Sequence, residues 1–234
     1  MLKISNLTKT YGDKKAVDNL SIHVEPGHIY GFIGHNGAGK TTTLKSIAGI
    51  LKFDEGEILI DGMDIITNAL SCKKILAYIP DNPDLYDFMT GMQYLNFICD
   101  VFEVNESDRK ERIESLGKTF EIYDNLNDAV SSYSHGMKQK LAIISAWVHD
   151  PKLIIMDEPF VGLDPKAAHT LKGMMRELCD KGGAIFFSTH VLDVAEKLCD
   201  MVAIIKDGKL IRQGTMDDVK GDASLESVFL ELED

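Results

Sequence analysis

A short glycine-rich segment near the amino terminus holds the residue types best suited to phosphate chemistry. Gly34, Gly39, Lys40 and Thr41 fit the pattern G-x-x-x-x-G-K-[ST] of a P-loop. In this pattern glycines let backbone N–H groups turn toward a phosphate chain at the start of a helix, where the helix dipole also favours anions. We expect Lys40 to reach the terminal phosphates and Thr41 to ligate Mg²⁺. The predicted nucleotide contacts are Gly34, Asn36, Gly37, Ala38, Gly39, Lys40, Thr41 and Thr42.

Two adjacent acids and a histidine further along indicate the reaction, because a P-loop by itself fits a kinase, a GTPase or an ATPase. Asp157 ends an apolar run and Glu158 follows it directly. A strand-end Asp can hold Mg²⁺ through water, and a carboxylate one residue on can orient and deprotonate an attacking water. His190 also follows a strand end and could hydrogen-bond a γ-phosphate. The simpler interpretations are a solvated strand-to-loop junction for the acids and an ordinary loop or core histidine for His190.

These residues need a sheet to position them, and the apolar pattern predicts one. The segments 29–33, 153–157 and 184–189 are short continuous apolar runs, typical of strands buried in a parallel sheet. Segments 2–31 and 57–62 instead hold short β-type runs separated by turns, which predicts antiparallel strands ahead of the P-loop strand and after its helix.

Between these strand patterns, from about residue 85 to 150, the chain changes to helices. Thr90 and Gln93 predict a capping box, residues 107–122 a charged helix, and Ser134 the start of a third helix. We therefore expect an α/β protein: a P-loop NTPase core with a mixed β-sheet, an N-terminal antiparallel β subdomain and an inserted α-helical subdomain. The predicted division of the single domain 1–234 is 1–84 and 151–220 for the α/β core, 85–150 for the helical subdomain and 221–234 for a C-terminal helix.

The composition is that of a globular protein with an acidic surface. The 234 residues include 25 basic and 37 acidic side chains, and the formal net charge of −12 argues against nucleic-acid binding through phosphate contacts. The four cysteines form no C-x-x-C pair, so we expect reduced, mostly buried thiols. We find neither an amino-terminal apolar h-region nor a run approaching ~18 apolar residues. We expect a cytoplasmic protein that does not cross a membrane by itself.

Together these motifs resemble the ATP-binding cassette (ABC) family along essentially the whole chain. Residues 134–139, SHGMKQ, resemble the family signature LSGGQ, and residues 162–164 resemble its D-loop. Asp157 and Glu158 resemble its Walker B acid and catalytic glutamate. The resemblance implies that His190 is the switch histidine and that Tyr11 stacks on adenine. It implies an ATPase using ATP and Mg²⁺, with the catalytic residues Lys40, Glu158 and His190.

The signature segment also has a physical interpretation of its own. Ser134 and the backbone N–H of Gly136 open a helix and would form a second anion site. One chain would then offer two phosphate-binding helix ends but only one P-loop. In the resembled family the two ends meet across a head-to-tail dimer, with each signature closing on the partner's ATP. The resemblance therefore implies a homodimer or a pair with a homologous ATPase.

Two positions depart from the family pattern. Asp81 stands where the family's Q-loop has Gln or Glu, and its shorter side chain has less reach toward a metal or its water. We nevertheless place Asp81 with Thr41 and Asp157 at the expected Mg²⁺ site. His135 stands where Gly is commoner, and a side chain there requires a negative φ. Gly136, needed for close approach to phosphate, is retained.

Two further segments indicate a branch of the family. Residues 85–95 and 224–232 resemble the corresponding segments in ATPases of bacterial exporters for drugs, bacteriocins and lipids. We therefore expect a subunit that drives a separate transmembrane permease and associates with the inner face of the cell membrane only through it. The alternative is a soluble ABC ATPase acting on DNA or the ribosome. Such proteins usually carry paired cassettes or large insertions, and this chain has neither.

Overall fold

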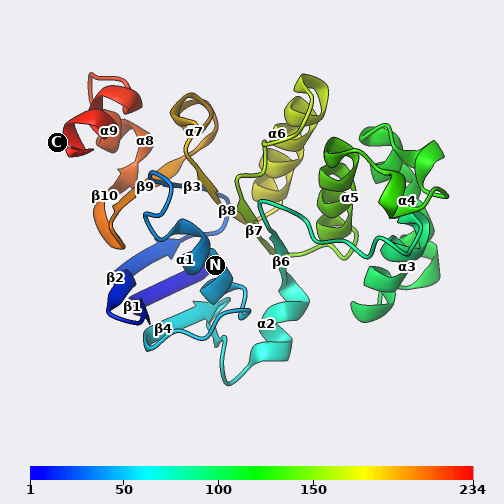
Figure 1. Ribbon diagram of the computed structural model, residues 1–234, viewed down its shortest axis with the longest axis horizontal. Coiled ribbons are helices and arrows are strands. Elements are labelled where there is room, and N and C mark those ends of the chain that lie inside the picture. Colours follow the sequence, from blue (N-terminus) through cyan, green and yellow to red (C-terminus); the bar gives the residue numbers. More distant parts are fainter. Residues whose placement is uncertain (234) are drawn as a thin grey trace.

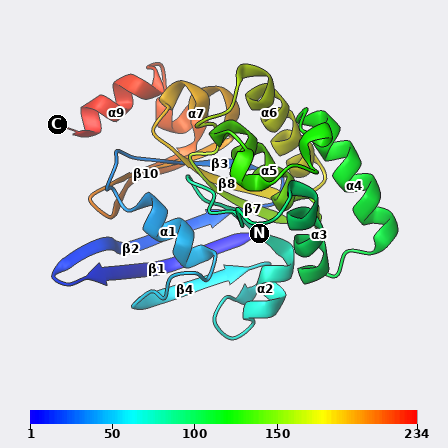
Figure 2. The ribbon, with the colours of Figure 1, turned by 45° about the vertical axis from the view of Figure 1, so that its right-hand side comes forward.

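Two β-sheets organise the protein, whose computed structural model describes residues 1–233 (Figures 1 and 2). The first sheet has four antiparallel strands in the order β2-β1-β4-β5. These strands are β1 (Leu2–Tyr11), β2 (Lys14–Val24), β4 (Glu55–Ile60) and β5 (Met63–Asp64). The predicted antiparallel sheet is confirmed, and β4, predicted at 57–62, pairs with β1.

The second sheet is mixed and carries the P-loop. Its six strands lie in the order β10-β9-β3-β8-β7-β6. They are β3 (Ile29–Ile33), β6 (Leu76–Ile79), β7 (Leu153–Asp157), β8 (Ala184–Thr189), β9 (Met201–Lys206) and β10 (Lys209–Thr215). All neighbours are parallel except β9 and β10, which form a hairpin. Because β3, β8 and β7 are adjacent and parallel, the residues that follow them meet at one edge, where ligands of open α/β sheets bind.

Helices pack on both faces of this sheet and fill the segment between β6 and β7. Figure 1 shows α3 (Gly91–Val101), α4 (Glu106–Thr119) and α5 (His135–Trp147) gathered at one end of the molecule, with α6 (Pro165–Asp180) beside them. The remaining helices are α1 (Lys40–Ile47), α2 (Ala69–Ile75), α7 (Leu192–Leu198), α8 (Met216–Lys220) and α9 (Leu225–Glu233). Two 3-10 turns, Tyr123–Asn125 and Val130–Ser132, connect α4 to α5.

The helix starts at Thr90 and Ser134 confirm the predicted capping chemistry. Thr90 and Gln93 form the reciprocal capping box of α3, each accepting the backbone N–H of the other. Asp164 accepts a backbone N–H in the first turn of α6, and Ser134 does the same for α5. Short polar side chains at these positions satisfy N–H groups that have no partner inside the helix. They therefore fix where the helices begin.

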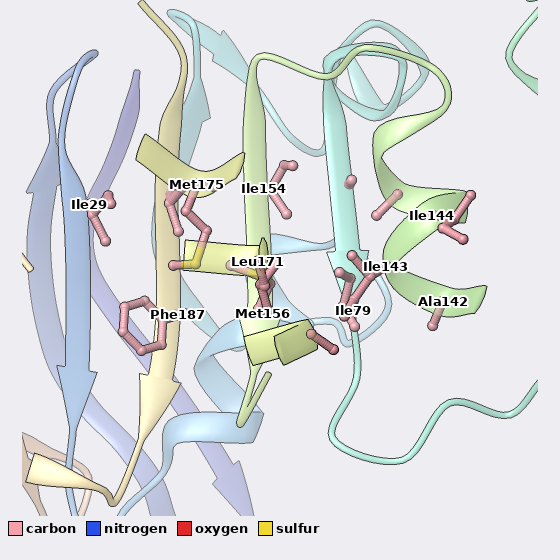
Figure 3. Packing of buried hydrophobic residues seen from close by; sticks show 14 of the residues in the cluster. Ile29, Ile79, Ala142, Ile143, Ile144, Ile154, Met156, Leu171, Met175 and Phe187 are labelled. Atoms are coloured by element: carbon pink, nitrogen blue, oxygen red, sulfur yellow. The ribbon is translucent and has the colours of Figure 1, made fainter. Parts of the chain in front are cut away.

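Two hydrophobic clusters hold the second sheet from opposite faces. One lies between the two sheets and includes Phe32, Phe186 and Leu44 of α1. The other packs β3, β7 and β8 against α6 and the helical segment, with Ile154 and Phe187 among its members (Figure 3). Successive strand residues face opposite sides, so Phe186 and Phe187 belong to different clusters. Burial on both faces explains why these strands appear as continuous apolar runs in the sequence.

Five elements, β5, α2, β6, α7 and α8, were not predicted from the sequence. They contain between 2 and 7 residues, which is too short for a clear periodicity. Helix α9 begins within the predicted C-terminal helix segment 221–234, of which residue 234 lies outside the described residues. The four cysteines are free and buried, as predicted. No helix in residues 1–233 is long and apolar enough to cross a membrane.

Candidate active site

The P-loop joins β3 to α1 and turns sharply at its last glycine. Gly39 has a φ of +108°, which residues with a side chain avoid, and it is the N-cap of α1 without a side-chain cap. A β-carbon at Gly39 would lie 2.3 Å from the carbonyl oxygen of Ala16, so a larger residue would push the loop away from β2. The start of α1 therefore keeps its N–H groups free of a capping side chain, as a phosphate site requires.

Lys40 folds back over this loop. Its Nζ donates to the carbonyl oxygens of Gly34 at 2.5 Å and His35 at 3.2 Å, and it lies 3.7 Å from Oε1 of Glu158. Burial lowers the pKa of Lys40, and the negative charges of Glu158 and Asp157 oppose that shift. The ammonium is thus held by neutral carbonyls and one carboxylate. Phosphate oxygens entering the loop are stronger acceptors for it than the carbonyls.

Both carboxylate oxygens of Asp157 are hydrogen-bonded to neighbouring elements. Thr41 Oγ1 donates to Oδ2 at 2.6 Å, and Ser188 Oγ donates to Oδ1 at 2.5 Å. The sheet explains the second bond, because Asp157 and Ser188 are direct partners on the parallel strands β7 and β8. Asp157 is only 2% exposed. Thr41 and Asp157, both predicted as metal ligands, are therefore brought together at the end of β7.

Ser188 is a residue of this site that the sequence reasoning missed. It is fully buried in β8, donates to Asp157, and accepts the backbone N–H of Glu158 at 3.2 Å. The position of Ser188 in the sequence could have predicted this role. Ser188 follows Phe186 and Phe187 in a buried strand, where a hydroxyl needs a polar partner, and this strand ends just before His190.

Glu158 has a backbone conformation that is uncommon for a residue with a side chain, with φ of +48°. The carbonyl oxygen of Ser188 accepts its N–H as well. Its Oε1 lies 2.9 Å from Nδ1 of His190, and its Oε2 accepts the His190 backbone N–H at 3.4 Å. The two predicted catalytic residues, from different strand ends, thus contact each other. Uncommon conformations of this kind concentrate at functional sites, where neighbouring groups hold them.

A cleft of about 340 Å³ opens over the P-loop. Its lining residues are Tyr11, Lys14, Ala16, His35, Asn36, Gly37, Gly39, Lys40, Thr41, Thr42, Asp81, Asp157 and Glu158. Tyr11 is 52% exposed, so a face of its ring is available to a nucleotide base. Gly34 and Ala38, both predicted contacts, are not among the lining residues. Gly34 acts on this site through its carbonyl oxygen, which holds Lys40.

The oxygen ligands at this cleft fit Mg²⁺. Thr41 and Asp157 meet there, and Asp81 lines the same cleft. Mg²⁺ takes one or two carboxylates and completes its shell with waters and substrate phosphates, so a threonine hydroxyl beside an acid suits it.

The start of α5, the second predicted phosphate site, is separate from this cleft. Neither Ser134 nor Gly136 is among the residues that line the cleft. Ser134 is exposed and its Oγ accepts the Met137 backbone N–H at 3.2 Å. His135 begins the helix and does not have a positive φ, so the requirement predicted for a side chain at this position is met.

A P-loop after a buried parallel strand, an acid bonded to the P-loop threonine and a contacting glutamate–histidine pair define a P-loop ATPase. Comparison with known proteins then gives the family. The profile of the ABC transporter family matches residues 17–161, and the chain belongs to this family. It is an ATP-binding subunit of an ABC transporter, and it hydrolyses ATP.

Three known proteins illustrate the relationship. The ABC-type transporter ATP-binding protein EcsA of Bacillus subtilis (strain 168) is 34% identical over 237 residues, covering 99% of this chain and 96% of EcsA. The Nod factor export ATP-binding protein I of Rhizobium etli (strain ATCC 51251) is 34% identical over 218 residues, covering 93% of this chain and 69% of that protein. A solved structure of an ATP-binding subunit of an ABC transporter, 34% identical, matches with a TM-score of 0.96 over 100% of both chains.

Proposed function

We propose that this chain is the ATPase subunit of an exporter, and that it dimerises around two ATP molecules to drive a separate transmembrane permease. The contacts of Glu158 with Lys40 and His190 carry the catalytic part of this proposal, because they join the P-loop to the ends of β7 and β8. The likeness to the Nod factor export protein and the pattern at residues 85–95 support export.

Each residue around the cleft has a position that supports one role. Lys40 binds the terminal phosphates, and Glu158 orients and deprotonates the attacking water. His190 contacts Glu158 and has an exposed side chain, which supports a role as donor to the γ-phosphate. Tyr11 stacks on the adenine. Mg²⁺, when bound, neutralises charge on the β- and γ-phosphate oxygens. We assign it to Thr41 and Asp157, with Asp81 as a third ligand.

The start of α5 supports the dimer. Ser134 is exposed, and neither it nor Gly136 belongs to the P-loop cleft. A phosphate that binds at this helix start is therefore best supplied by ATP held on a second chain. The second chain is either another copy or a homologous ATPase. A shared ATP would be the main contact between the two chains, so dimerisation should depend on nucleotide.

The dimer is tested by trapping ATP on the chain. Glu158→Gln removes the proposed base at constant size, so this variant should bind ATP and hydrolyse it roughly 10²- to 10⁴-fold more slowly. With Mg-ATP it should elute from gel filtration as a dimer. Adding Ser134→Arg should prevent the shift, whereas Ser131→Arg, at a second exposed serine, should leave it intact. Wild-type turnover by Glu158→Gln, or a dimer that tolerates Ser134→Arg, would contradict the proposal.

A cluster of exposed aromatic rings supports docking of the permease. Tyr86 lies 5.7 Å from both Phe88 and Phe97, measured between ring centroids, and Phe88 is 82% exposed. Contiguous exposed apolar surface of this kind marks interaction sites, and an amphipathic helix of the permease would bury it. Replacing Phe88 and Met89 with Ser should uncouple ATPase activity from transport while basal hydrolysis continues. Leu70→Ser, which changes an exposed leucine on α2, is the control. Equal loss of hydrolysis and transport would indicate misfolding instead.

The alternative, a soluble ATPase acting on DNA or the ribosome, is disfavoured by the net charge of −12. Under our proposal the chain binds no nucleic acid and works in the cytoplasm, at the inner face of the membrane, through its permease. Each segment in the predicted division of the chain then has its own role. The core, 1–84 and 151–220, holds ATP, 85–150 holds the signature and the docking surface, and 221–234 adds a C-terminal helix. ATPase activity stimulated by DNA or ribosomes, and not by a permease, would favour the alternative.

A further inference from the structure

His135 makes a contact that the ATP cycle described above does not use. Its ring rests on Gly162, in the loop 158–164 that leads from Glu158 to α6. A β-carbon built on Gly162 would lie 2.5 Å from Cδ2 and 2.8 Å from Nε2 of His135. The next residue, Gly136, approaches the same loop so closely that its own β-carbon would lie 2.9 Å from the Gly162 carbonyl oxygen. The start of α5 is thus seated directly on this loop.

Two side chains further along α5 extend the contact to both ends of the loop. Gln139 is fully buried, and its Nε2 donates to the carbonyl oxygen of Pro159 at 3.5 Å. Lys140 Nζ lies 2.8 Å from Oδ2 of Asp164. Pro159 follows Glu158 directly, and Asp164 is the N-cap of α6. Contacts with α5 therefore run from one end of the loop to the other.

The loop itself offers little to fix its conformation. Its internal backbone hydrogen bonds among the described residues are Val161 N–H to Glu158 O at 3.1 Å and Leu163 N–H to Phe160 O at 3.3 Å. Phe160 packs edge-on against Phe187 of β8, which ties the middle of the loop to the core. The loop begins with the uncommon φ of Glu158, and such a conformation persists only where surrounding groups hold it.

We propose that His135 is a positioning residue for Glu158. Its ring holds the loop 158–164 on the start of α5, so the placement of the signature sets the placement of the glutamate in the same chain. This inference rests on the proposed function, in which the partner's ATP seats on Ser134 and Gly136. The contact of His135 with Gly162 would therefore link the seating of that ATP at the start of α5 to the position of Glu158.

Two substitutions separate the ring contact from other roles of the histidine. His135→Ala removes the ring, and we expect kcat to fall about tenfold, because small misplacements of a catalytic group cost this much or more. His135→Phe keeps a flat ring over Gly162 and should retain turnover close to wild type. His169→Ala, at an exposed histidine of α6, is the matched control. Binding of a fluorescent ATP analogue to the single chain should be unchanged in all three, since His135 and His169 do not line the P-loop cleft.

A second measurement distinguishes positioning from dimer contact. In the Glu158→Gln background, His135→Ala should still form the Mg-ATP dimer, because Ser134 and Gly136 remain. A merely structural defect would lower dimerisation and melting temperature together. If the Glu158→Gln protein itself failed to dimerise, that result would count against the proposed function. The turnover of His135→Ala and His135→Phe relative to wild type would still decide the role of His135.

A double-mutant cycle tests the contact itself. Gly162→Ala places a β-carbon against the ring and also carries backbone strain, since Gly162 has a φ of +79°. The strain is present in both backgrounds and cancels in the cycle. We expect Gly162→Ala to reduce kcat several-fold more in wild type than in His135→Ala. Additive effects, or wild-type kcat in His135→Ala, would overturn the proposal. Equal loss in His135→Ala and His135→Phe would also overturn it, by pointing to the imidazole nitrogens rather than the ring.

Discussion

The two helix starts that could bind phosphate, those of α1 and α5, present their backbone N–H groups differently. At α1 the N-cap is Gly39 in a left-handed conformation, and no side chain caps the helix. At α5 the N-cap is Ser134, whose own hydroxyl accepts an N–H of the first turn. The first start opens into the cleft, and the second lies on the surface. The helix start of α1 thus lines a cleft within the chain, whereas the helix start of α5 faces outward.

The surroundings explain why only one of these sites is complete within the chain. At α1, Lys40 is buried and faces the acids at the end of β7. At α5, the nearby lysines are engaged elsewhere: Lys138 pairs with Asp87 at 2.7 Å, and Lys140 pairs with Asp164 at 2.8 Å. An anion at α5 therefore depends on the N–H groups and Ser134. Such a site suits a phosphate that is already bound to a partner.

Replacing Lys40 should disrupt the site at the start of α1. Lys40→Ala removes the buried ammonium that, in our proposal, contacts phosphates in both the ground state and the transition state. We expect weaker ATP binding and a fall in kcat/KM of roughly 10²- to 10³-fold. Nucleotide titration and steady-state ATPase assays measure the two losses. Unchanged ATP affinity would show that Lys40 stays on its loop carbonyls when nucleotide binds.

A smaller effect is expected at the incomplete site. Ser134→Ala removes a hydroxyl from the start of α5, and ATP hydrolysis should fall about tenfold, while a single chain binds ATP as before. Thr90→Ala is the matched control, because it removes a cap of the same kind from α3, at a cost of about 1 kcal/mol in unfolding free energy. Equal loss of activity in the two variants would mean that Ser134 acts only as a helix cap.

Substitutions of Asp81 test whether this residue belongs to the Mg²⁺ site beside the start of α1, and their expected effect is the smallest of the three. If it contacts Mg²⁺ or its water, Asp81→Asn should raise the Mg²⁺ concentration for half-maximal ATPase several-fold, because charge at the site favours the cation. Asp81→Gln, which restores the residue common in the family, should remain active. Magnesium titrations of the ATPase rate measure both. An unchanged requirement in Asp81→Asn would leave Asp81 with a structural role in its loop.

Much of the α/β fold could be predicted, because local patterns encode it. Strands such as Leu153–Asp157, buried on both faces, appear as apolar runs, and polar caps such as Ser134 mark helix starts. Short elements such as β6 and α7 were not predicted, because they form through packing on neighbouring elements rather than from a local sequence pattern. Ser188 was missed for a related reason. Its role comes from its pairing with Asp157 across two strands that lie far apart in the sequence.

The sequence by itself determined the chemistry of the site: the P-loop pattern, the adjacent acids after an apolar strand, and the signature residues. Those features are local. The backbone freedom of a glycine, the charge of a lysine and the hydroxyl of an N-cap serine act within a few residues of their own positions. Tertiary structure alone decided which of these residues meet. The order of the parallel strands brings Glu158 next to His190 and Lys40. The packing of α5 on the loop 158–164 places His135 against Gly162. These contacts join residues that lie far apart in the chain, and they follow from the burial of side chains that are distant in the sequence.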